Sequence, residues 1–202
     1  MKILAVADKV EPYLCEPSGQ ERFPGIDLIL ACGDLPPEYL TSLSTLFKVP
    51  LGYVRGNHDI RHQTVPPAGC INLHGRIATI QGLRLGGFEG SRWYNGGPIQ
   101  YTERQMHRMT RRLRWAFWRA KGVDCIVTHA PPRHIHDAED PCHRGFRCYS
   151  TLIERYQPHY FIHGHIHTLF RSPRERITRI GETRVINAYG HCLLDTEADT
   201  IA

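Results

Sequence analysis

The stretch Gly56-Asn57-His58-Asp59 lies one residue after the short apolar run Leu51–Val54, so an amide, an imidazole and a carboxylate stand where a buried strand is expected to end. Four other apolar runs close on polar side chains in the same way: Asp8 after Ile3–Ala7, Asp34 after Leu28–Ala31, His129 after Cys125–Val127, and His165 with His167 after Tyr160–Ile162. Strand ends are where the sheets of α/β proteins bind ligands, and a mixed set of Asp, Asn and His favours Mn, Fe or Zn over Ca or Mg. The pattern therefore predicts a hydrolytic metal centre.

The order of elements along the chain indicates an α/β protein. The runs Lys2–Ala7 and Asp27–Ala31 are almost continuously apolar, as in strands that are buried on both faces. Pro36-Pro37 is expected to open a helix through Phe47, because proline fits the first helical turn. Further elements are expected as strands at Leu51–Val54, in three short pieces within Cys70–Gly87, at Asp124–Val127, His159–Ile162 and Arg184–Ala188, and as a helix near Tyr149–Tyr156. With no linker and no internal repeat, the sequence predicts one domain over residues 1–202.

The bulk composition is ordinary for a globular protein, with 41% hydrophobic and 22% charged residues in a chain of 202. No apolar run approaches the roughly 20 residues that cross a bilayer, and the N-terminus lacks a signal-peptide pattern, so we expect a cytoplasmic protein without a membrane span. Seven cysteines without CxxC spacing indicate reduced thiols, with Cys32 and Cys125 inside core strands. The net charge of +5 selects no substrate class, and the sequence leaves the oligomeric state open.

The clearest predicted helix covers Thr102–Lys121, with Thr102 as its cap. Its apolar residues hold helical spacing: Met106, Met109, Leu113, Ala116, Phe117 and Ala120. The remaining positions are rich in arginine, which suits nucleic acid or an acidic membrane surface but more often forms the solvated face of a packed helix. Nucleic acid is therefore not expected as a partner. Trp115 and Trp118 fall partly off the apolar stripe, which leaves a partner-binding face open.

The polar strand ends resemble, in order and spacing, the motifs of the calcineurin-like metallophosphoesterase superfamily. The pieces concerned are Asp8, Gly33-Asp34, Gly56-Asn57-His58-Asp59, Thr128-His129 and Gly164-His165-Ile166-His167. The resemblance implies an α/β fold of the four-layer sandwich type, in which helices flank two mixed β-sheets. It also implies two divalent metal ions, for which Mn²⁺ is the first expectation and Fe or Zn the alternatives.

The same resemblance implies a role for each motif residue. Asp34 would bridge the two ions, Asp8 and His167 would bind the first ion, and Asn57, His129 and His165 would bind the second. His58 would face the substrate, where an imidazole can stabilise the phosphoryl group or protonate the leaving oxygen. Asp59 would orient the ring of His58.

One position departs from the family pattern. The pattern Asp-x-His is replaced by Asp8-Lys9-Val10, and valine cannot bind a metal, so the first site lacks an imidazole. Three outcomes are open: water or Glu11 takes the position, the first ion binds weakly, or the centre holds one ion. We expect a weakened but occupied first site.

Two polar loops are candidates for the rim of the site. The segment Pro131–Phe146 follows His129 and offers His136 and His143 for contact with substrate or an accessory metal. The Gly86–Pro98 loop offers Arg92, whose planar guanidinium can clamp a phosphate. Solvated or ion-paired surface residues are the alternative in both loops.

The sequence thus favours a metal-dependent phosphoesterase that hydrolyses phosphomonoesters, including phosphoprotein, by attack of a metal-activated water. A phosphodiesterase or nuclease of the same superfamily is the alternative within enzymes. The alternative that is not an enzyme is a non-catalytic binding scaffold with this fold. Val10 favours the scaffold, because it replaces a metal-binding histidine. The retained pair His58-Asp59 argues for catalysis, because a scaffold needs no acid for a leaving group.

Overall fold

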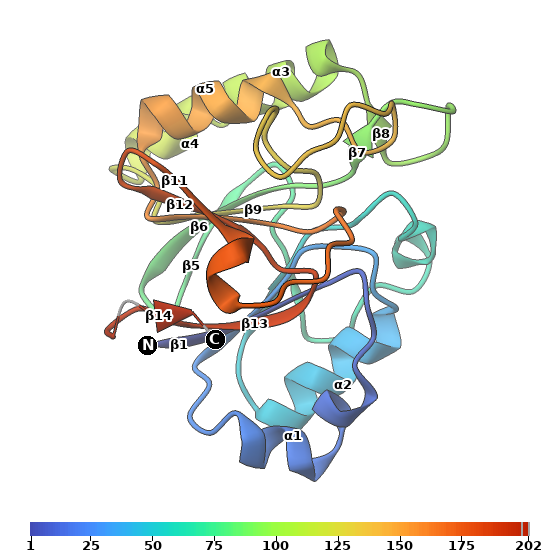
Figure 1. Cartoon of the computed structure of the whole chain (residues 1–202), viewed down its shortest axis with the longest axis vertical. Coiled ribbons are helices and arrows are strands. Elements are labelled where there is room, and N and C mark those ends of the chain that lie inside the picture. Colours follow the sequence, from blue (N-terminus) through green and yellow to red (C-terminus); the bar gives the residue numbers. More distant parts are fainter. Residues whose placement is uncertain (199, 202) are drawn as a thin grey trace.

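Two mixed β-sheets stack face to face at the centre of the protein (Figure 1). A computed structural model describes residues 1–198 and 200–201. In that part of the chain, the first six-stranded sheet has the order β14 (Thr200–Ile201), β13 (Gly190–Asp195), β1 (Lys2–Ala7), β2 (Leu28–Ala31), β3 (Leu51–Tyr53), β4 (Ile71–Asn72). The second has the order β11 (Ile177–Ile180), β12 (Thr183–Asn187), β10 (Tyr160–His163), β9 (Cys125–Thr128), β6 (Leu83–Phe88), β5 (Ile77–Ile80). The short pair β7 (Ser91–Arg92) and β8 (Gln100–Tyr101) lies outside both sheets.

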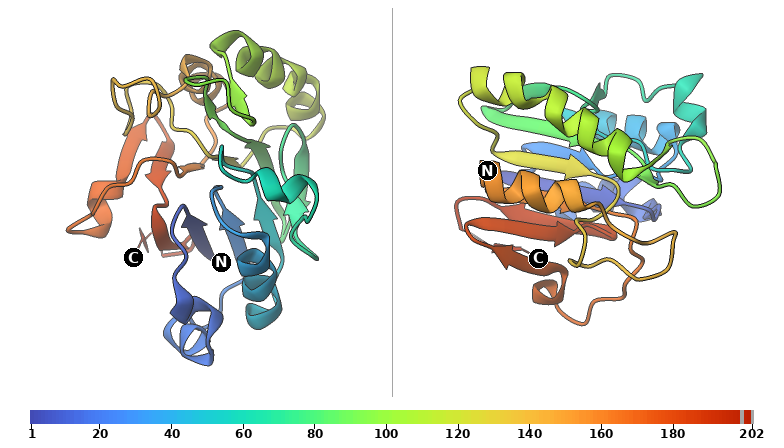
Figure 2. Two further views of the ribbon diagram at one scale, coloured as in Figure 1. Left: turned by 90° about the vertical axis from the view of Figure 1, so that its right-hand side faces the viewer. Right: turned by 90° about the horizontal axis from the view of Figure 1, so that it is seen from above.

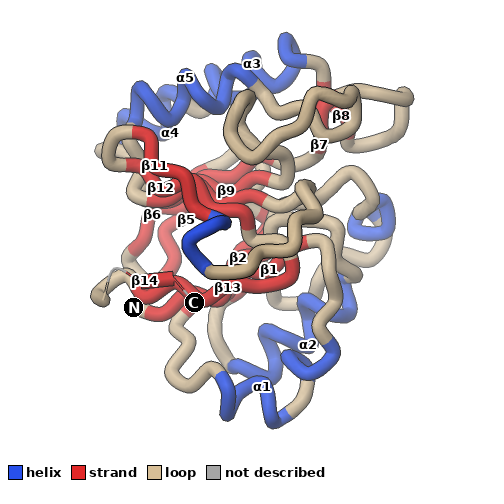
Figure 3. Tube along the Cα trace, viewed as in Figure 1, coloured by secondary structure: helices blue, strands red, loops and turns tan. Residues whose placement is uncertain are grey.

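Helices cover the outer face of each sheet, so the molecule has four layers (Figure 3). The first sheet is covered by α1 (Pro17–Arg22) and α2 (Pro37–Phe47), and the second by α3 (Glu103–Arg112), α4 (Arg114–Arg119) and α5 (Arg147–Tyr156). Three short 3₁₀ helices lie in connections: η1 (Pro12–Cys15), η2 (Ile60–Gln63) and η3 (Pro173–Arg176). The predicted four-layer α/β sandwich with two mixed sheets is confirmed.

The alternation of side chains along the strands explains why the sheets are buried on both faces. In β1, Ile3 and Ala5 point into the core between the two sheets, whereas Leu4 and Val6 point into the core under α1 and α2. In β10, Ile162 belongs to the core between the sheets and its neighbour Phe161 to the core under α3–α5. Successive residues of a strand face opposite sides, so a strand with apolar residues at every position fits only between two apolar layers.

Parallel pairing gathers the functional strand ends on one side of the molecule. β1, β2 and β3 run parallel in the first sheet, and β6, β9, β10 and β12 run parallel in the second. Figure 2 shows the two sheets from further directions, with the connections at their ends. The carboxyl ends of parallel strands meet at one edge of a sheet, which is where α/β proteins place their ligands.

Most expected elements are present with shifts of one or two residues, but the helix predicted over Thr102–Lys121 is divided. Thr102 does cap α3, in a reciprocal capping box with Gln105. The helix then ends at Arg112, and α4 begins at Arg114. Leu113, at φ −76° and ψ −9°, lies between the two helices, and its buried side chain packs in the core beneath them. Within the described residues, no helix combines the length and apolarity needed to cross a membrane.

Candidate metal centre

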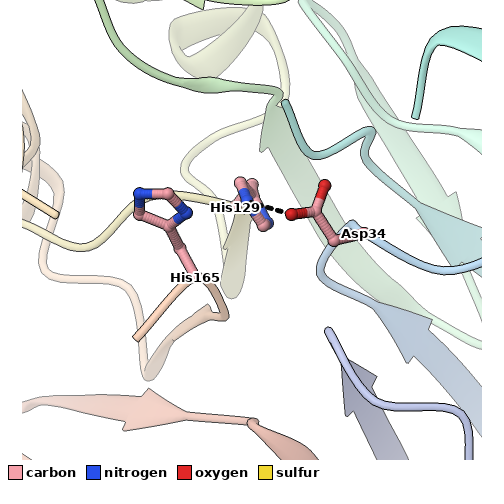
Figure 4. A group of neighbouring side chains, drawn as sticks. All are labelled: Asp34, His129 and His165. Atoms are coloured by element: carbon pink, nitrogen blue, oxygen red, sulfur yellow. Dashed lines mark ion pairs between the residues drawn. The ribbon is translucent and has the colours of Figure 1, made fainter. Parts of the chain in front are cut away.

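Asp34, His129 and His165 bring their ligand atoms within 4.8 Å of one another. Figure 4 shows the three side chains converging from three separate strand ends. Asp34 follows β2 of the first sheet, His129 follows β9 of the second, and His165 follows β10 beside it. Oδ2 of Asp34 lies 3.3 Å from Nε2 of His129. Both histidines are buried and the side chain of Asp34 is 11% exposed, so the group lies at the floor of the site.

Backbone carbonyls fix which nitrogen of each histidine is free to bind a metal. Nδ1 of His129 donates to the carbonyl oxygen of Cys32 at 2.8 Å, which turns Nε2 toward Asp34. Oδ1 of Asn57 lies 3.1 Å from the same Nε2. Nε2 of His165 donates to the carbonyl oxygen of Cys142 at 2.9 Å, which leaves Nδ1 as its ligand atom. A hydrogen bond on the outer nitrogen is the usual way in which a metal-binding imidazole is oriented.

The electrostatics of Asp34, His129 and His165 favour a positive charge between these side chains. Burial alone would raise the pKa of Asp34, but the charge and hydrogen bond of His129, with the backbone N–H of His58, hold that pKa well below its ordinary value. Burial alone would lower the pKa of His129, but Asp34 and Asp8 raise it to about 9. Burial lowers the pKa of His165 to about 3, so this ring stays neutral. An anionic carboxylate, an amide oxygen and imidazole nitrogens that converge on one point fit a divalent cation, which would take the place of the proton on His129.

Asp8 and His167 lie beside this group but form a looser arrangement. The carboxylate of Asp8 is fully buried and accepts the backbone N–H of His165 at 2.9 Å. Nε2 of His167 lies 3.5 Å from Oδ1 of Asp8, and its ring is stacked on Tyr189. The hydrogen bond to Asp8, together with the charge of Asp8, outweighs desolvation and raises the pKa of His167.

The missing imidazole of the first motif is not replaced by Glu11 in this structure. Val10 is 41% exposed. Glu11 forms an ion pair with Lys9, with 2.8 Å between Oε1 and Nζ. The lysine beside Asp8 is thus held by Glu11, and each residue neutralises the charge of the other.

The Gly56-Asn57-His58-Asp59 loop is held by the carboxylate of Asp59. Its Oδ2 accepts the backbone N–H groups of Gly56 and Asp34 at 2.7 and 2.8 Å, and its Oδ1 lies 3.6 Å from Nε2 of His62. Among the described hydrogen bonds, none joins Asp59 to the ring of His58. In this structure Asp59 ties the loop that carries Asn57 to the loop that carries Asp34. That Asp59 also orients the ring of His58 stays a prediction. The ring of His58 is exposed, so a molecule that enters the site can contact it.

Close backbone approach explains why glycine precedes the candidate ligands Asn57 and His165. A Cβ on Gly56 would collide with the carboxylate of Asp34, and a Cβ on Gly164 would come within 2.6 Å of Oδ2 of Asp8. Three of the candidate ligands, Asp8, Asp34 and His165, also have positive φ angles of 64°, 55° and 68°. Left-handed conformations are uncommon outside glycine and gather at functional sites. The local backbone is therefore strained where the ligands converge.

The family model of the calcineurin-like phosphoesterase superfamily domain matches residues 1–198. The chain belongs to the calcineurin-like phosphoesterase superfamily.

Several solved structures share this fold. TT1561 of Thermus thermophilus is 19% identical with a TM-score of 0.71, and the match covers 100% of this chain and 96% of that chain. An archaeal phosphodiesterase is 14% identical with a TM-score of 0.54, covering 100% and 98%. The calcineurin-like phosphoesterase YfkN from Bacillus subtilis is 13% identical with a TM-score of 0.55, covering 100% and 87%. Comparison with curated proteins gave no match. At these identities, the structural likeness shows the fold alone.

Two of the three expected rim residues of this calcineurin-like chain, Arg92 and His136, form contacts within the protein. Nη1 of Arg92 forms an ion pair with Glu103 at 2.6 Å, and its guanidinium lies over the ring of Phe146. His136 is hydrogen-bonded to His163 and to Thr178, both at 2.9 Å.

His143 is the expected rim residue that lies against the metal group. Its ring centroid is 5.3 Å from that of His165, and its Nδ1 donates to the carboxylate of Asp140 at 3.0 Å. The side chain of His143 is 41% exposed, so it can contact a ligand that enters the site.

Tyr94 is a residue at the site that sequence reasoning did not single out. Its hydroxyl accepts the amide N–H of Asn57 at 3.4 Å and is hydrogen-bonded to Cys142. The sequence indicates the glycine-rich loop as part of the rim, but it favours Arg92 over Tyr94 within that loop. Tyr94 stands next to Trp93 in a loop with few other apolar residues. This position indicates an unusual aromatic pair, but it does not predict the contact between Tyr94 and Asn57.

Proposed function

We propose that this protein is a metal-dependent phosphoesterase that hydrolyses phosphomonoesters. The observation that carries the proposal is the convergence of Asp34, Asn57, His129 and His165, whose oxygen and nitrogen atoms surround one position at the floor of the site. Membership of the calcineurin-like superfamily supports it. The exposed ring of His58 beside this position supports a catalytic role over a purely structural metal.

We infer two divalent ions, with Mn²⁺ preferred and Fe or Zn as alternatives. The second site would use Asn57, His129 and His165, and Asp34 would be shared between both sites. The first site would add Asp8 and His167 and would bind its ion more weakly, since Val10 supplies no ligand and Glu11 is engaged by Lys9. We treat residues 1–202 as one domain that carries the whole centre.

Divalent ions held by the candidate ligands would supply an activated water and would neutralise charge on the phosphoryl group. The chain's own residues orient and protonate the substrate. The amide of Asn57 and the ring of His58 hold the phosphoryl oxygens. As the bond between phosphorus and the ester oxygen breaks and the bond to the water oxygen forms, His58 donates a proton to the departing alkoxide. The attacking water loses one proton to solvent, and His58 takes up one proton from solvent before the next cycle, so the products are an alcohol and inorganic phosphate.

The test is hydrolysis of para-nitrophenyl phosphate and of its bis-ester, with Mn, Fe, Zn, Ni and Mg supplied in turn. We expect metal-dependent turnover of the monoester. His58→Ala should reduce it less than it reduces turnover of an alkyl phosphomonoester, because para-nitrophenolate leaves without a proton. Faster turnover of the bis-ester would assign the site to a phosphodiesterase instead. Silence with every metal would favour the binding scaffold, for which the exposed Val10 in place of a ligand is the supporting observation.

A further inference from the structure

The segment 102–121 carries the positive charge of the whole protein. It holds seven basic residues and one acidic residue, whereas the rest of the chain holds 18 basic and 19 acidic residues. Part of this charge gathers around α4 and the end of α5, on a surface that we call the basic tryptophan face. This face is defined by Arg111, Arg112, Arg114, Trp115, Trp118 and Arg155. None of its four arginines forms an ion pair with a carboxylate among the described contacts.

The two tryptophans of this face project into solvent. Leu113 and Phe117 fill the inward positions of this part of the chain and are buried. Trp115 and Trp118 are 67% and 71% exposed, and their rings meet edge to face with centroids 4.8 Å apart. The outer ring faces are therefore free. Exposure of two adjacent large aromatic rings has no role in the core packing of α4 and indicates a binding surface.

Three adjoining hollows lie along this face, and tryptophan side chains line two of them. One of about 290 Å³ lies between α3 and α5 and shares Arg111, Arg114 and Arg155 with a second of about 750 Å³. The second shares Trp115 with a third of about 680 Å³ beside β5. No carboxylate lines any of the three. The surface is thus a chain of cationic depressions interrupted by aromatic rings.

This face is separate from the candidate metal centre. β9 begins at Cys125, just after Gly122 of the second hollow, and ends at Thr128 next to the ligand His129. The face and the centre therefore lie at opposite ends of the same strand. In Figure 1, α4 occupies one end of the helix layer and the loop that follows β9 lies toward the other.

We propose that the basic tryptophan face binds single-stranded nucleic acid. Proteins that bind single strands combine a cationic groove along the backbone with aromatic rings on which bases stack, and this face offers both. The phosphates would follow Arg111, Arg112 and Arg114, and unpaired bases would stack on the free ring faces. An anionic bilayer fits less well, because a membrane-bound helix buries a broad apolar face, whereas the apolar residues Leu113 and Phe117 point inward here.

The sequence alone favoured a solvated helix face, and the structure changes this interpretation. The exposure of both rings and the connection of the hollows depend on α5 and β5, which lie far from α4 in the sequence. The proposal does not depend on phosphoesterase activity.

The experiment is a titration of the full chain with oligouridylate and oligothymidylate of about 20 nucleotides, long enough to span a typical binding site. Binding is followed by quenching of tryptophan fluorescence at several salt concentrations. We expect quenching at low salt and a slope of log affinity against log salt of roughly −0.7 for each phosphate neutralised. Arg112→Gln with Arg114→Gln should reduce the slope by roughly 1.4 if both contact phosphates.

Trp118→Ala should weaken binding by roughly 5- to 150-fold, as for loss of one stacked base. Trp93→Ala is the matched control, because Trp93 is 57% exposed but lies outside this face, and it should leave affinity unchanged. Circular dichroism and thermal unfolding verify that each variant is folded. The proposal is overturned by absence of binding at low salt, by equal losses in the two tryptophan variants, or by binding to phosphatidylserine vesicles without binding to either oligonucleotide. The last outcome would assign the face to a membrane surface.

Discussion

The ring of His58 is the exposed member of a loop whose other polar groups are all engaged. Asn57 faces His129, Asp59 accepts two backbone N–H groups, and the backbone N–H of His58 donates to Oδ1 of Asp34 at 2.9 Å. The backbone of His58 therefore belongs to the metal group while its side chain reaches toward solvent. This division suits a residue that acts on the substrate without holding the metal.

His58→Ala is expected to lower kcat by roughly 10²- to 10⁴-fold, the usual contribution of a general acid. The affinity for metal should stay unchanged, because no ligand atom is removed. The loss should be smaller for esters of acidic alcohols, whose alkoxides leave without a proton. Steady-state kinetics on a series of phosphomonoesters, with calorimetric titration of Mn²⁺, measures both effects. An equal loss for every leaving group would show that the ring positions the substrate and donates no proton.

Val10→His is expected to strengthen the first metal site. The added imidazole completes the Asp-x-His pattern beside Asp8, and position 10 is 41% exposed, so the larger ring meets little steric resistance. One more ligand should raise affinity for the second equivalent of Mn²⁺ by roughly tenfold or more, given that even supporting residues contribute 10- to 100-fold. Metal counting after dialysis against graded Mn²⁺ provides the measurement. Val10→Gln, which is larger but binds metals poorly, is the control, and equal stoichiometry in both variants would contradict the prediction.

For single residues, the sequence predicts which positions carry the candidate ligands better than it predicts which side chains those residues contact. Asp34, His129 and His165 could be found because each ends an apolar strand, and strand ends converge in any sheet of this kind. The partners of Asp59 and the contact of Tyr94 with Asn57 could not be found, because they depend on how three loops fold over one another. An ion pair such as Arg92 with Glu103 likewise joins a loop to a helix start that the sequence does not place together.

Among the elements, β10 and the loop before α5 are linked by a chain of neutral histidines. Nδ1 of His163 donates to the carbonyl oxygen of Gly164 at 2.9 Å, so its Nε2 accepts from Nδ1 of His136 at 2.9 Å. Nε2 of His136 then accepts from the hydroxyl of Thr178, which lies on β11. A proton added to Nε2 of His163 would place two N–H groups face to face. A proton added to Nε2 of His136 would leave the hydroxyl of Thr178 without its acceptor. The chain is therefore complete only when both rings are neutral.

This arrangement predicts loss of stability in acid. Burial lowers the pKa of His136 from 6.5 to about 4, so the folded state binds the proton less readily than the unfolded state. Stability is retained above the unfolded pKa and falls as the pH drops from 6.5 toward 4, by on the order of 3 kcal/mol for this group. Urea unfolding of the metal-free protein between pH 7.5 and 4 provides the measurement. His136→Gln should flatten the acid limb, whereas His107→Gln, at an exposed position, should not; equal curves for all three proteins would contradict the prediction.

The sequence predicts the boundaries of strands that are continuously apolar. It does not predict boundaries that depend on packing against distant parts of the chain. The division of the helix at Leu113 could not be predicted, since the residues around it favour a continuous helix. β13 was not expected, although its side chains alternate between buried and half-buried positions. It was missed because its partner is β1, at the other end of the chain.

For the whole molecule, the candidate metal centre joins the two sheets. Asp34 and Asn57 come from loops of the first sheet, and His129 and His165 come from loops of the second. The core between the sheets is apolar, with Ile162 and other strand residues, and the opening at the strand ends is spanned by the ligand group. A cation bound there would hold one half of the molecule to the other.

Metal binding is therefore expected to stabilise the fold as a whole. A ligand that binds only the folded state, at 100 times its Kd, adds about 2.7 kcal/mol to the free energy of unfolding. For a chain of this size, each kcal/mol raises Tm by about 2 to 4 °C. Mn²⁺ should therefore raise Tm by roughly 5 to 11 °C. Asp34→Asn removes the carboxylate that faces His129 and should abolish this rise. Asp140→Asn also removes one carboxylate, but from a half-exposed side chain outside the group, and it should retain the rise. Differential scanning calorimetry of the three proteins with and without Mn²⁺ decides the matter: an undiminished rise in Asp34→Asn would mean that the stabilising ion binds elsewhere and that the two sheets are held together without it.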